Sequence, residues 1–129
     1  MKLLTYKIKK FDTPQIGVLQ NQLVYNLNHC FGNISLLDLI QLKDYQDQVA
    51  NFISNNDCLK HDIKDITVLP VIPKPTSFRD AYAFRQHVAT SRKNRGSEMI
   101  PEFDQFPVFY FSNHNAMFAD GQNIELMPD

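Results

Sequence analysis

One stretch of the chain, residues 75–96, concentrates the side chains that could do chemistry. It contains Asp80, Tyr82 and His87, together with five of the thirteen Lys and Arg residues. An aspartate carboxylate is a hard oxygen ligand that suits Mg²⁺, Ca²⁺ or Mn²⁺. A histidine titrates near neutral pH and is a standard general base beside a metal-bound or polarised water. The stretch therefore suggests metal-assisted acid–base chemistry, for which one carboxylate alone is not a complete metal site.

Two local structures fit these residues. A helix beginning at Ser77 would place Asp80 and His87 near one stripe, with Ser77 and Asp80 as a capping box and Phe84 and Val88 packing inward, which describes an ordinary surface helix. Alternatively, the chain stays extended through Asp80 and the phenol two residues later and becomes helical only afterwards. The carboxylate and the phenol would then face a pocket that His87 also reaches.

The charge pattern limits the partners. The basic residues of the stretch would lie around a helix rather than along one face, and acidic residues follow directly, which disfavours a nucleic-acid footprint. The net charge of −1 gives no general attraction to nucleic acid or to an anionic membrane. We therefore expect neither partner, and expect one arginine to clamp a carboxylate substrate bidentately.

Length and composition are those of a globular protein. The 129 residues are 43% hydrophobic and 21% charged, enough for one domain with a core or for one small domain plus part of another. There is no apolar leader and no apolar run of roughly 20 residues, so we expect a cytoplasmic protein. Cys30 and Cys58 are interpreted as reduced thiols.

Residues 1–74 are predicted to form an accessory domain. Alternation of Leu4, Tyr6 and Ile8 with polar neighbours indicates an edge strand, and residues 16–25 indicate a hairpin. Ser35 and Asp38 predict a capping box at the start of a helix, and residues 44–53 predict a second helix. His29 and His61 stand in polar surroundings and are interpreted as surface residues. A strand from Ile66 leads into a proline-spaced linker at residues 70–75, which we take as the domain boundary.

Residues 75–129 are predicted to form a second domain, so that the fold class is α+β. Residues 106–111 read as a buried-looking strand, and residues 112–115 as the polar loop after it. Asp120 and Gly121 mark a turn, and residues 123–126 resemble the start of another strand.

These strings carry a resemblance to a known family. Residues 73–80 (PKPTSFRD), 85–87 (RQH) and 106–115 (FPVFYFSNHN) resemble the fumarylacetoacetate hydrolase family, and residues 1–74 are similar to the domain that precedes its catalytic domain. The resemblance implies a mixed-β catalytic fold rolled around a divalent metal, Mg²⁺, Ca²⁺ or Mn²⁺. It also implies hydrolysis of a carbon–carbon bond in a β-diketo acid, or decarboxylation or isomerisation of a related keto acid.

The resemblance also implies roles for single residues. Asp80 matches a metal-ligating carboxylate, and His87 matches the general base that activates water. Tyr82 and Tyr110 match substrate-contacting tyrosines. Arg95 is the nearest match to a substrate-binding arginine, with Arg92 as the alternative because the spacing from His87 differs by about one residue.

The sequence departs from the family pattern after these matches. It contains no Glu-x-Glu pair, and residues 119–123 read ADGQN where the family has a Gly-Pro-Gly-Asp-Asp type of segment. We therefore expect the N-terminal portion of an enzyme, inactive alone, that holds a metal only with the C-terminal region and assembles as a homodimer or with a complementary C-terminal chain. The alternative is a non-catalytic interaction module that assembles through an exposed 106–111 strand.

Overall fold

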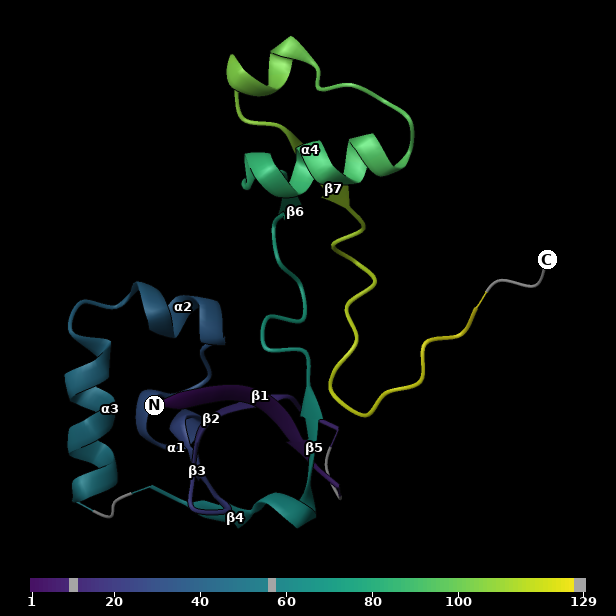
Figure 1. Cartoon of the computed structure of the whole chain (residues 1–129). Coiled ribbons are helices and arrows are strands. Elements are labelled where there is room, and N and C mark those ends of the chain that lie inside the picture. Colours follow the sequence, from purple (N-terminus) through teal and green to yellow (C-terminus); the bar gives the residue numbers. More distant parts are fainter. Residues whose placement is uncertain (10–11, 56–57, 127–129) are drawn as a thin grey trace. The chain divides into compact units, whose positions relative to one another are not determined.

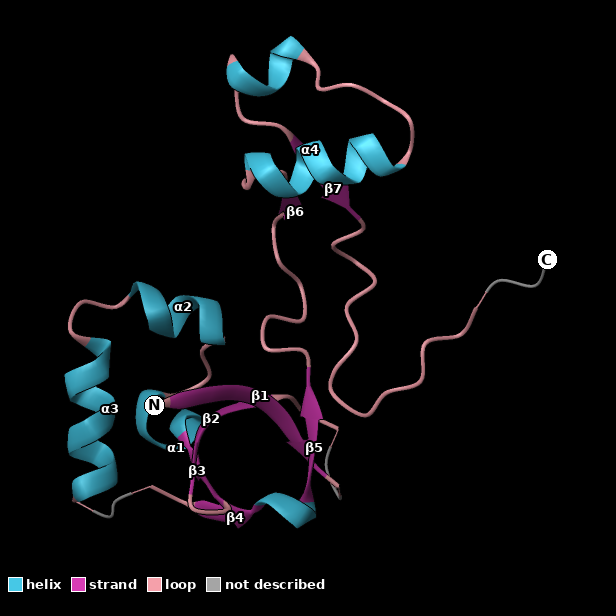
Figure 2. Cartoon of the chain, viewed as in Figure 1, coloured by secondary structure: helices cyan, strands magenta, loops and turns pink. Residues whose placement is uncertain are grey.

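The computed structural model describes residues 1–9, 12–55 and 58–126. Two compact units make up the chain: residues 1–74 with the segment from Met117 onward, and residues 75–116. Both helices and antiparallel strands are present, which confirms the α+β class (Figures 1 and 2). In the described ranges no helix is both long and apolar enough to cross a membrane.

A five-stranded antiparallel sheet forms the centre of the first unit. Its strands are β1 (Lys2–Ile8), β2 (Gln15–Gln20), β3 (Leu23–Asn26), β4 (Lys60–Asp62) and β5 (Ile66–Leu69), in the order β4-β3-β2-β1-β5. The predicted hairpin is confirmed. Its two-residue turn places Asn21 and Gln22 at φ of 50° and 66°, the left-handed pair that matches the twist of a tight hairpin.

The prediction that the first strand is an edge strand is wrong. β1 lies between β2 and β5, because β5 returns from a distant part of the sequence and pairs with its second side. Thr5, predicted to face solvent, is buried, and its hydroxyl donates a hydrogen bond of 2.6 Å to the Val71 carbonyl oxygen. A polar side chain is tolerated at this buried position because its hydroxyl has a partner.

The sheet curls until strands that are not neighbours approach one another (Figure 1). The rings of Tyr6 in β1 and His61 in β4 are 6.0 Å apart, although β2 and β3 separate these strands in the sheet. A short 3₁₀ helix, η1 (Ile63–Asp65), carries the chain from β4 to β5, and the Lys9 amide donates to the Asp65 carbonyl oxygen at 3.3 Å. His61 is therefore half-buried with its Nε2 enclosed, and is not the fully exposed surface residue that was predicted; His29 is exposed as predicted.

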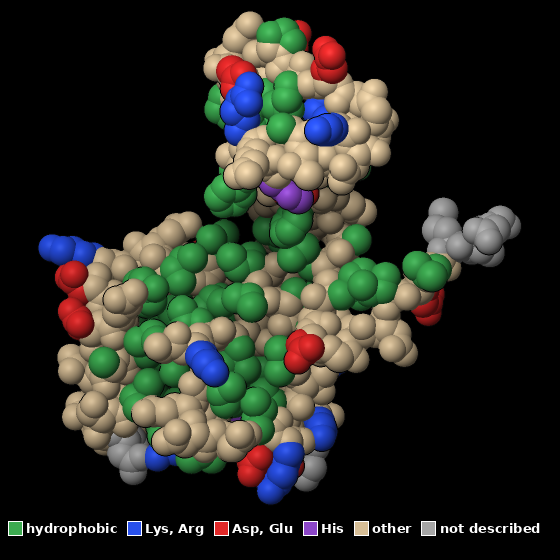
Figure 3. Space-filling view, viewed as in Figure 1, with side chains coloured by type: hydrophobic (Ala, Val, Ile, Leu, Met, Phe, Trp, Pro, Cys, Tyr) green, Lys and Arg blue, Asp and Glu red, His purple; other side chains and the backbone are tan. Residues whose placement is uncertain are grey.

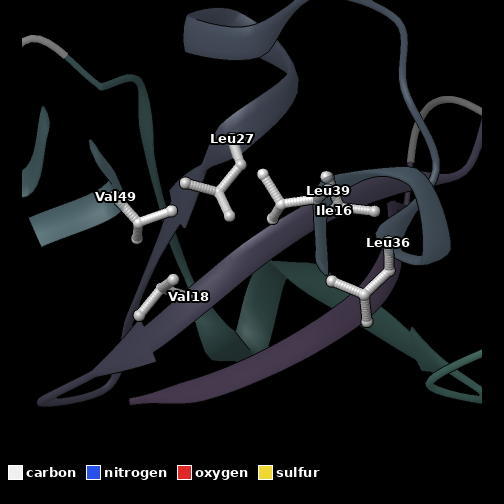
Figure 4. Packing of buried hydrophobic residues seen from close by; sticks show 6 residues of the cluster. All are labelled: Ile16, Val18, Leu27, Leu36, Leu39 and Val49. Carbon is white, nitrogen blue, oxygen red and sulfur yellow. The ribbon is translucent and has the colours of Figure 1, made fainter. Parts of the chain in front are cut away.

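Two apolar clusters fill the first unit. One consists of Leu4, Tyr6, Val24 and Ile66. The other joins the sheet to the helices α1 (Leu27–Phe31), α2 (Leu36–Gln41) and α3 (Tyr45–Ser54), and consists of Ile16, Val18, Leu27, Leu36, Leu39 and Val49 (Figure 4). The predicted capping box is present at the start of α2, where the Asp38 amide donates to Ser35 Oγ at 3.2 Å and the Ser35 amide to Asp38 Oδ2 at 3.1 Å. The second predicted helix is confirmed as α3.

The second unit contains β6 (Phe78–Ala81), α4 (Arg85–Asn94), the 3₁₀ helix η2 (Pro101–Asp104) and β7 (Phe109–Ser112). The prediction of a helix beginning at Ser77 is therefore wrong, since residues 78–81 are extended and pair with β7. The alternative prediction, in which Asp80 lies on an extended segment before a later helix, is confirmed. The predicted 106–111 strand is found at residues 109–112, but it is not buried as predicted: its residues 109–111 are exposed, because within the described residues β7 pairs only with β6.

The segment from Met117 onward contains one of its two predicted features. The turn at Asp120–Gly121 is present, with Gly121 at φ 76° and the Gln122 amide donating to the Ala119 carbonyl oxygen at 3.2 Å. The prediction of a strand beginning at residues 123–126 is wrong, since the described residues of this segment form no strand. Ile124 and Leu126 are 66% and 88% exposed there, and no neighbouring strand supplies hydrogen bonds to stabilise an extended ladder.

Candidate functional site

The antiparallel pair β6–β7 positions Asp80. Its register places Asp80 directly opposite Tyr110, and Arg79 opposite Phe111. Residues directly opposite one another in an antiparallel pair project to the same face, and successive residues alternate between faces. The carboxylate of Asp80 and the phenol of Tyr110 therefore share one face of β6–β7. Two of the predicted site residues, 30 positions apart in the sequence, are neighbours for this reason.

Tyr82 lies where β6 ends. Its amide donates to the Val108 carbonyl oxygen at 3.0 Å, which extends the ladder by one bond. The Ala83 amide then donates to the Ala81 carbonyl oxygen at 2.9 Å, closing a three-residue turn around Tyr82. The tyrosine is 46% exposed and lines an open hollow of about 440 Å³ together with residues of the 103–108 segment.

His87 lies in the first turn of α4 and is exposed. It lines a second open hollow, of about 650 Å³, with residues 83–86 and Thr90. Neither this hollow nor the one beside Tyr82 includes Asp80 or Tyr110 among its lining residues. The structure thus brings Asp80 and Tyr110 together but leaves His87 and Tyr82 in separate hollows, and the assigned roles stay predictions.

The two candidate substrate-binding arginines hold the end of α4. Arg95 Nε donates to the Ser91 carbonyl oxygen at 3.1 Å, and Arg92 Nε donates to the Glu98 carbonyl oxygen at 2.5 Å. Gly96, at φ 72°, follows the helix in the left-handed conformation typical of a helix end. Each arginine uses its Nε locally, so that its terminal nitrogens are the groups left to bind a carboxylate.

Arg85 is engaged by a carboxylate of the same unit. Its Nε and Nη2 donate to the two carboxylate oxygens of Asp104 at 2.8 and 3.0 Å, a bidentate pair that ties α4 to η2. The hydrogen bond from Arg85 lowers the pKa of Asp104, and the same bond raises the pKa of Arg85. This exposed pair links α4 to the loop that precedes β7 and engages both carboxylate oxygens of Asp104.

An arginine that lies against two phenyl rings was not apparent from the sequence. On the face of β6–β7 opposite Asp80, the Arg79 guanidinium carbon lies 5.2 Å from the ring centroid of Phe109 and 5.1 Å from that of Phe111. The two rings are themselves 5.1 Å apart in an edge-to-face arrangement. The alternation of Phe109 and Phe111 in a predicted strand was the signal that could have revealed a shared face; its pairing with Arg79 required the strand register.

Asp80 is the candidate metal ligand in this region. Among the residues that the structure describes, no group of three or more His, Cys, Asp and Glu side chains could hold a metal ion. Oxygen-ligand sites draw their affinity from the number and charge of their ligands, so Asp80 with the phenol of Tyr110 would hold a divalent ion only weakly. A carboxylate and a phenol are oxygen donors of the type that suits a hard cation, but a tight metal site would need more carboxylates than Asp80 alone.

A hollow of about 660 Å³ lies in the first unit, between the start of β1, the β2–β3 turn and the end of α3. Lys2 is the one charged side chain among its lining residues, and neither histidine nor carboxylate is present there. On the face seen in Figure 3, apolar side chains of this unit are widely exposed and charged ones lie mostly near its margin. These features do not form a catalytic constellation.

Comparison of the sequence with protein-family models and with curated protein sequences found no match.

Proposed function

We propose that this chain contributes the Asp80 side of a divalent-metal site in a fumarylacetoacetate-hydrolase-like enzyme, which hydrolyses a carbon–carbon bond in a β-diketo acid or decarboxylates or isomerises a related keto acid. The observation that supports the proposal is the pairing of Asp80 with Tyr110 on one face of β6–β7, on an extended segment that leads into the helix carrying His87. A carboxylate and a phenol on one face can contact a metal ion and a substrate oxygen at the same place.

The proposed chemistry assigns one task to each side chain. Asp80 would hold Mg²⁺, Ca²⁺ or Mn²⁺, and the bound ion would supply Lewis acidity toward the keto acid. Tyr82 and Tyr110 donate hydrogen bonds to substrate oxygens. His87 accepts a proton from the attacking water, whose oxygen bonds to the carbonyl carbon. When the carbon–carbon bond then breaks, its electron pair stays on the departing carbon as an enolate, which takes the proton back from His87.

A carboxylate substrate also needs a cationic partner at its far end. Arg95 fills this role in the proposal, with Arg92 as the alternative, because a guanidinium binds a carboxylate through two parallel hydrogen bonds. Holding both ends of the substrate would orient its reacting carbonyl toward the water.

The proposal includes a source for the other carboxylates. Asp80 alone does not give a tight site, so we propose that a C-terminal region, a second copy of the chain or a complementary polypeptide adds further acidic ligands. We expect the chain by itself to be inactive and to gain hydrolase activity when such a partner is present.

Paramagnetic relaxation by Mn²⁺ tests the proposed metal position. We expect titration of the ¹⁵N-labelled chain with Mn²⁺ to broaden the amide signals of Asp80 and Tyr110 first, with an affinity on the order of 10⁻³ M for a site of few ligands. Asp80→Asn should abolish this selective broadening, whereas Asp120→Asn, which removes an exposed carboxylate elsewhere, should preserve it. Equal broadening at all acidic residues, or no effect of Asp80→Asn, would contradict the assignment.

A second function is favoured by a separate observation. Three consecutive aromatic residues of β7 are strongly exposed: Phe109 by 40%, Tyr110 by 71% and Phe111 by 61%. Soluble proteins seldom leave such a row of large apolar side chains without a partner. We propose, as the alternative, a non-catalytic interaction module that assembles with another polypeptide through this strand.

A further inference from the structure

The β6–β7 sheet is an incomplete structural element. It has two strands of four residues each, and within the described part of the chain neither strand pairs with a third. Two-stranded sheets are marginally stable in water by themselves and gain stability when another strand adds to an edge or covers a face. Both edges and the exposed rings of β7 are thus suited to an added strand.

Arg79 determines what chemistry that strand must have. Its guanidinium lies against the rings of Phe109 and Phe111, and it forms no ion pair with a carboxylate of the described residues. A strand laid over these rings would also remove the guanidinium from water. Burying a cation without a counter-charge is costly, whereas a carboxylate that meets the guanidinium fork offsets that cost.

We propose that the Arg79 face, defined as Arg79, Phe109 and Phe111, binds an extended segment of a partner protein in which a glutamate or aspartate is flanked by apolar residues at alternate positions. Such a segment places the carboxylate on the guanidinium and its apolar side chains on the two rings, because alternate residues of a strand share one face. A second copy of this chain docking by the same face would instead bring a second guanidinium into the interface and no carboxylate, which would leave two cations buried without a counter-charge.

This surface is distinct from the proposed metal site. Arg79 and Asp80 are adjacent in β6, so they project to opposite faces of the pair. The inference rests on the second proposed function, assembly through β7, and adds the chemistry of the partner. It does not require Asp80 to bind a metal.

Peptide titrations of the ¹⁵N-labelled full chain test the inference. The probe is a blocked heptapeptide of threonine at odd positions, valine at positions two and six and glutamate at the centre, and its matched control carries glutamine instead of glutamate. We expect saturable shifts of the Arg79 Nε–H signal and of the amides of β7. The glutamate peptide should bind about fivefold to tenfold more tightly than the glutamine peptide.

Two variants separate the role of Arg79 from that of net charge. Arg79→Gln should make the two affinities equal, whereas Lys93→Gln, which removes the same charge from the exposed side of α4, should preserve the preference. Unchanged methyl signals of the buried Val88 would verify that the unit remains folded in each variant.

Each alternative result has a definite meaning. Equal binding of both peptides to the unmodified chain would overturn the role of Arg79 while leaving strand addition intact, and the absence of shifts with either peptide would overturn both. Shifts that depend on chain concentration without peptide would assign the face to a second copy and refute the acidic partner. Asp80→Asn should leave the preference for the glutamate peptide over the glutamine peptide unchanged. The peptide titration therefore tests the Arg79 face independently of the proposed metal site.

Discussion

Alkaline unfolding of the first unit should depend on one phenol. Tyr6 is fully buried in the curled sheet, and its hydroxyl has no hydrogen-bond partner among the described residues. Burial raises the pKa of Tyr6 from 10.0 to about 12, and the neighbouring Asn26 side chain opposes this with a smaller lowering effect. The folded unit therefore strongly disfavours the phenolate.

The direction of the pH effect follows from that difference. Between pH 10 and about 12 the unfolded chain releases the Tyr6 proton while the folded unit retains it, so the free energy of unfolding falls as the pH rises. The full contribution of Tyr6 to the free energy of unfolding is present below pH 10 and is lost above about pH 12. The pKa difference corresponds to about 2.7 kcal/mol in total, of which about 1.4 kcal/mol is lost by about pH 11.

Urea unfolding at about pH 9 and about pH 11, followed through the ¹³C methyl signals of the buried Val18 and Val24, measures this loss in the first unit. The unmodified chain should lose about 1.4 kcal/mol more between the two conditions than Tyr6→Phe, which has no proton to release. Tyr45→Phe, at a half-buried tyrosine in α3, should behave like the unmodified chain. Equal losses in the unmodified chain and Tyr6→Phe would refute the argument that burial of Tyr6 controls its ionisation.

Two further predictions concern the first unit. Gly17→Ala should lower the free energy of unfolding by about 2 kcal/mol or more, because its Cβ would lie 2.7 Å from Val24 Cγ1 and 2.9 Å from the Tyr25 carbonyl oxygen; a denaturation midpoint equal to that of the unmodified chain would contradict this close packing. Ser35→Ala should cost about 1 kcal/mol by removing the acceptor of the Asp38 amide, as measured by urea unfolding against the control Ser54→Ala at the end of α3. A larger loss in the control would show that the cap is not the cause.

The candidate site was only partly accessible from the sequence. Residue types singled out Asp80, and the mixture of aspartate, tyrosine and histidine suggested its chemistry. Whether Asp80 lay on a helix or on a strand stayed open, because Ser77 and Asp80 also have the spacing of a capping box. Asp80 lies on a strand because its segment pairs with β7, and this pairing places Tyr110 beside it. The position of Arg79 against the two rings depends on the same register.

Local structure in the first unit was determined by the sequence. The hairpin at residues 15–26 and the capping box of Ser35 and Asp38 depend on residues a few positions apart, whose side-chain alternation and hydrogen-bonding groups are visible in the chain itself.

Tertiary structure alone decided which strand is central and which histidine is partly enclosed. β1 becomes an inner strand because β5, about 60 residues later, pairs with its free side, and His61 is half-buried because the curled sheet brings β4 to Tyr6. The alternation of a strand specifies which side chains share a face, but it carries no information about a partner contributed from far along the chain. Long-range pairing and curvature supply that information, and they exist only once the chain has folded.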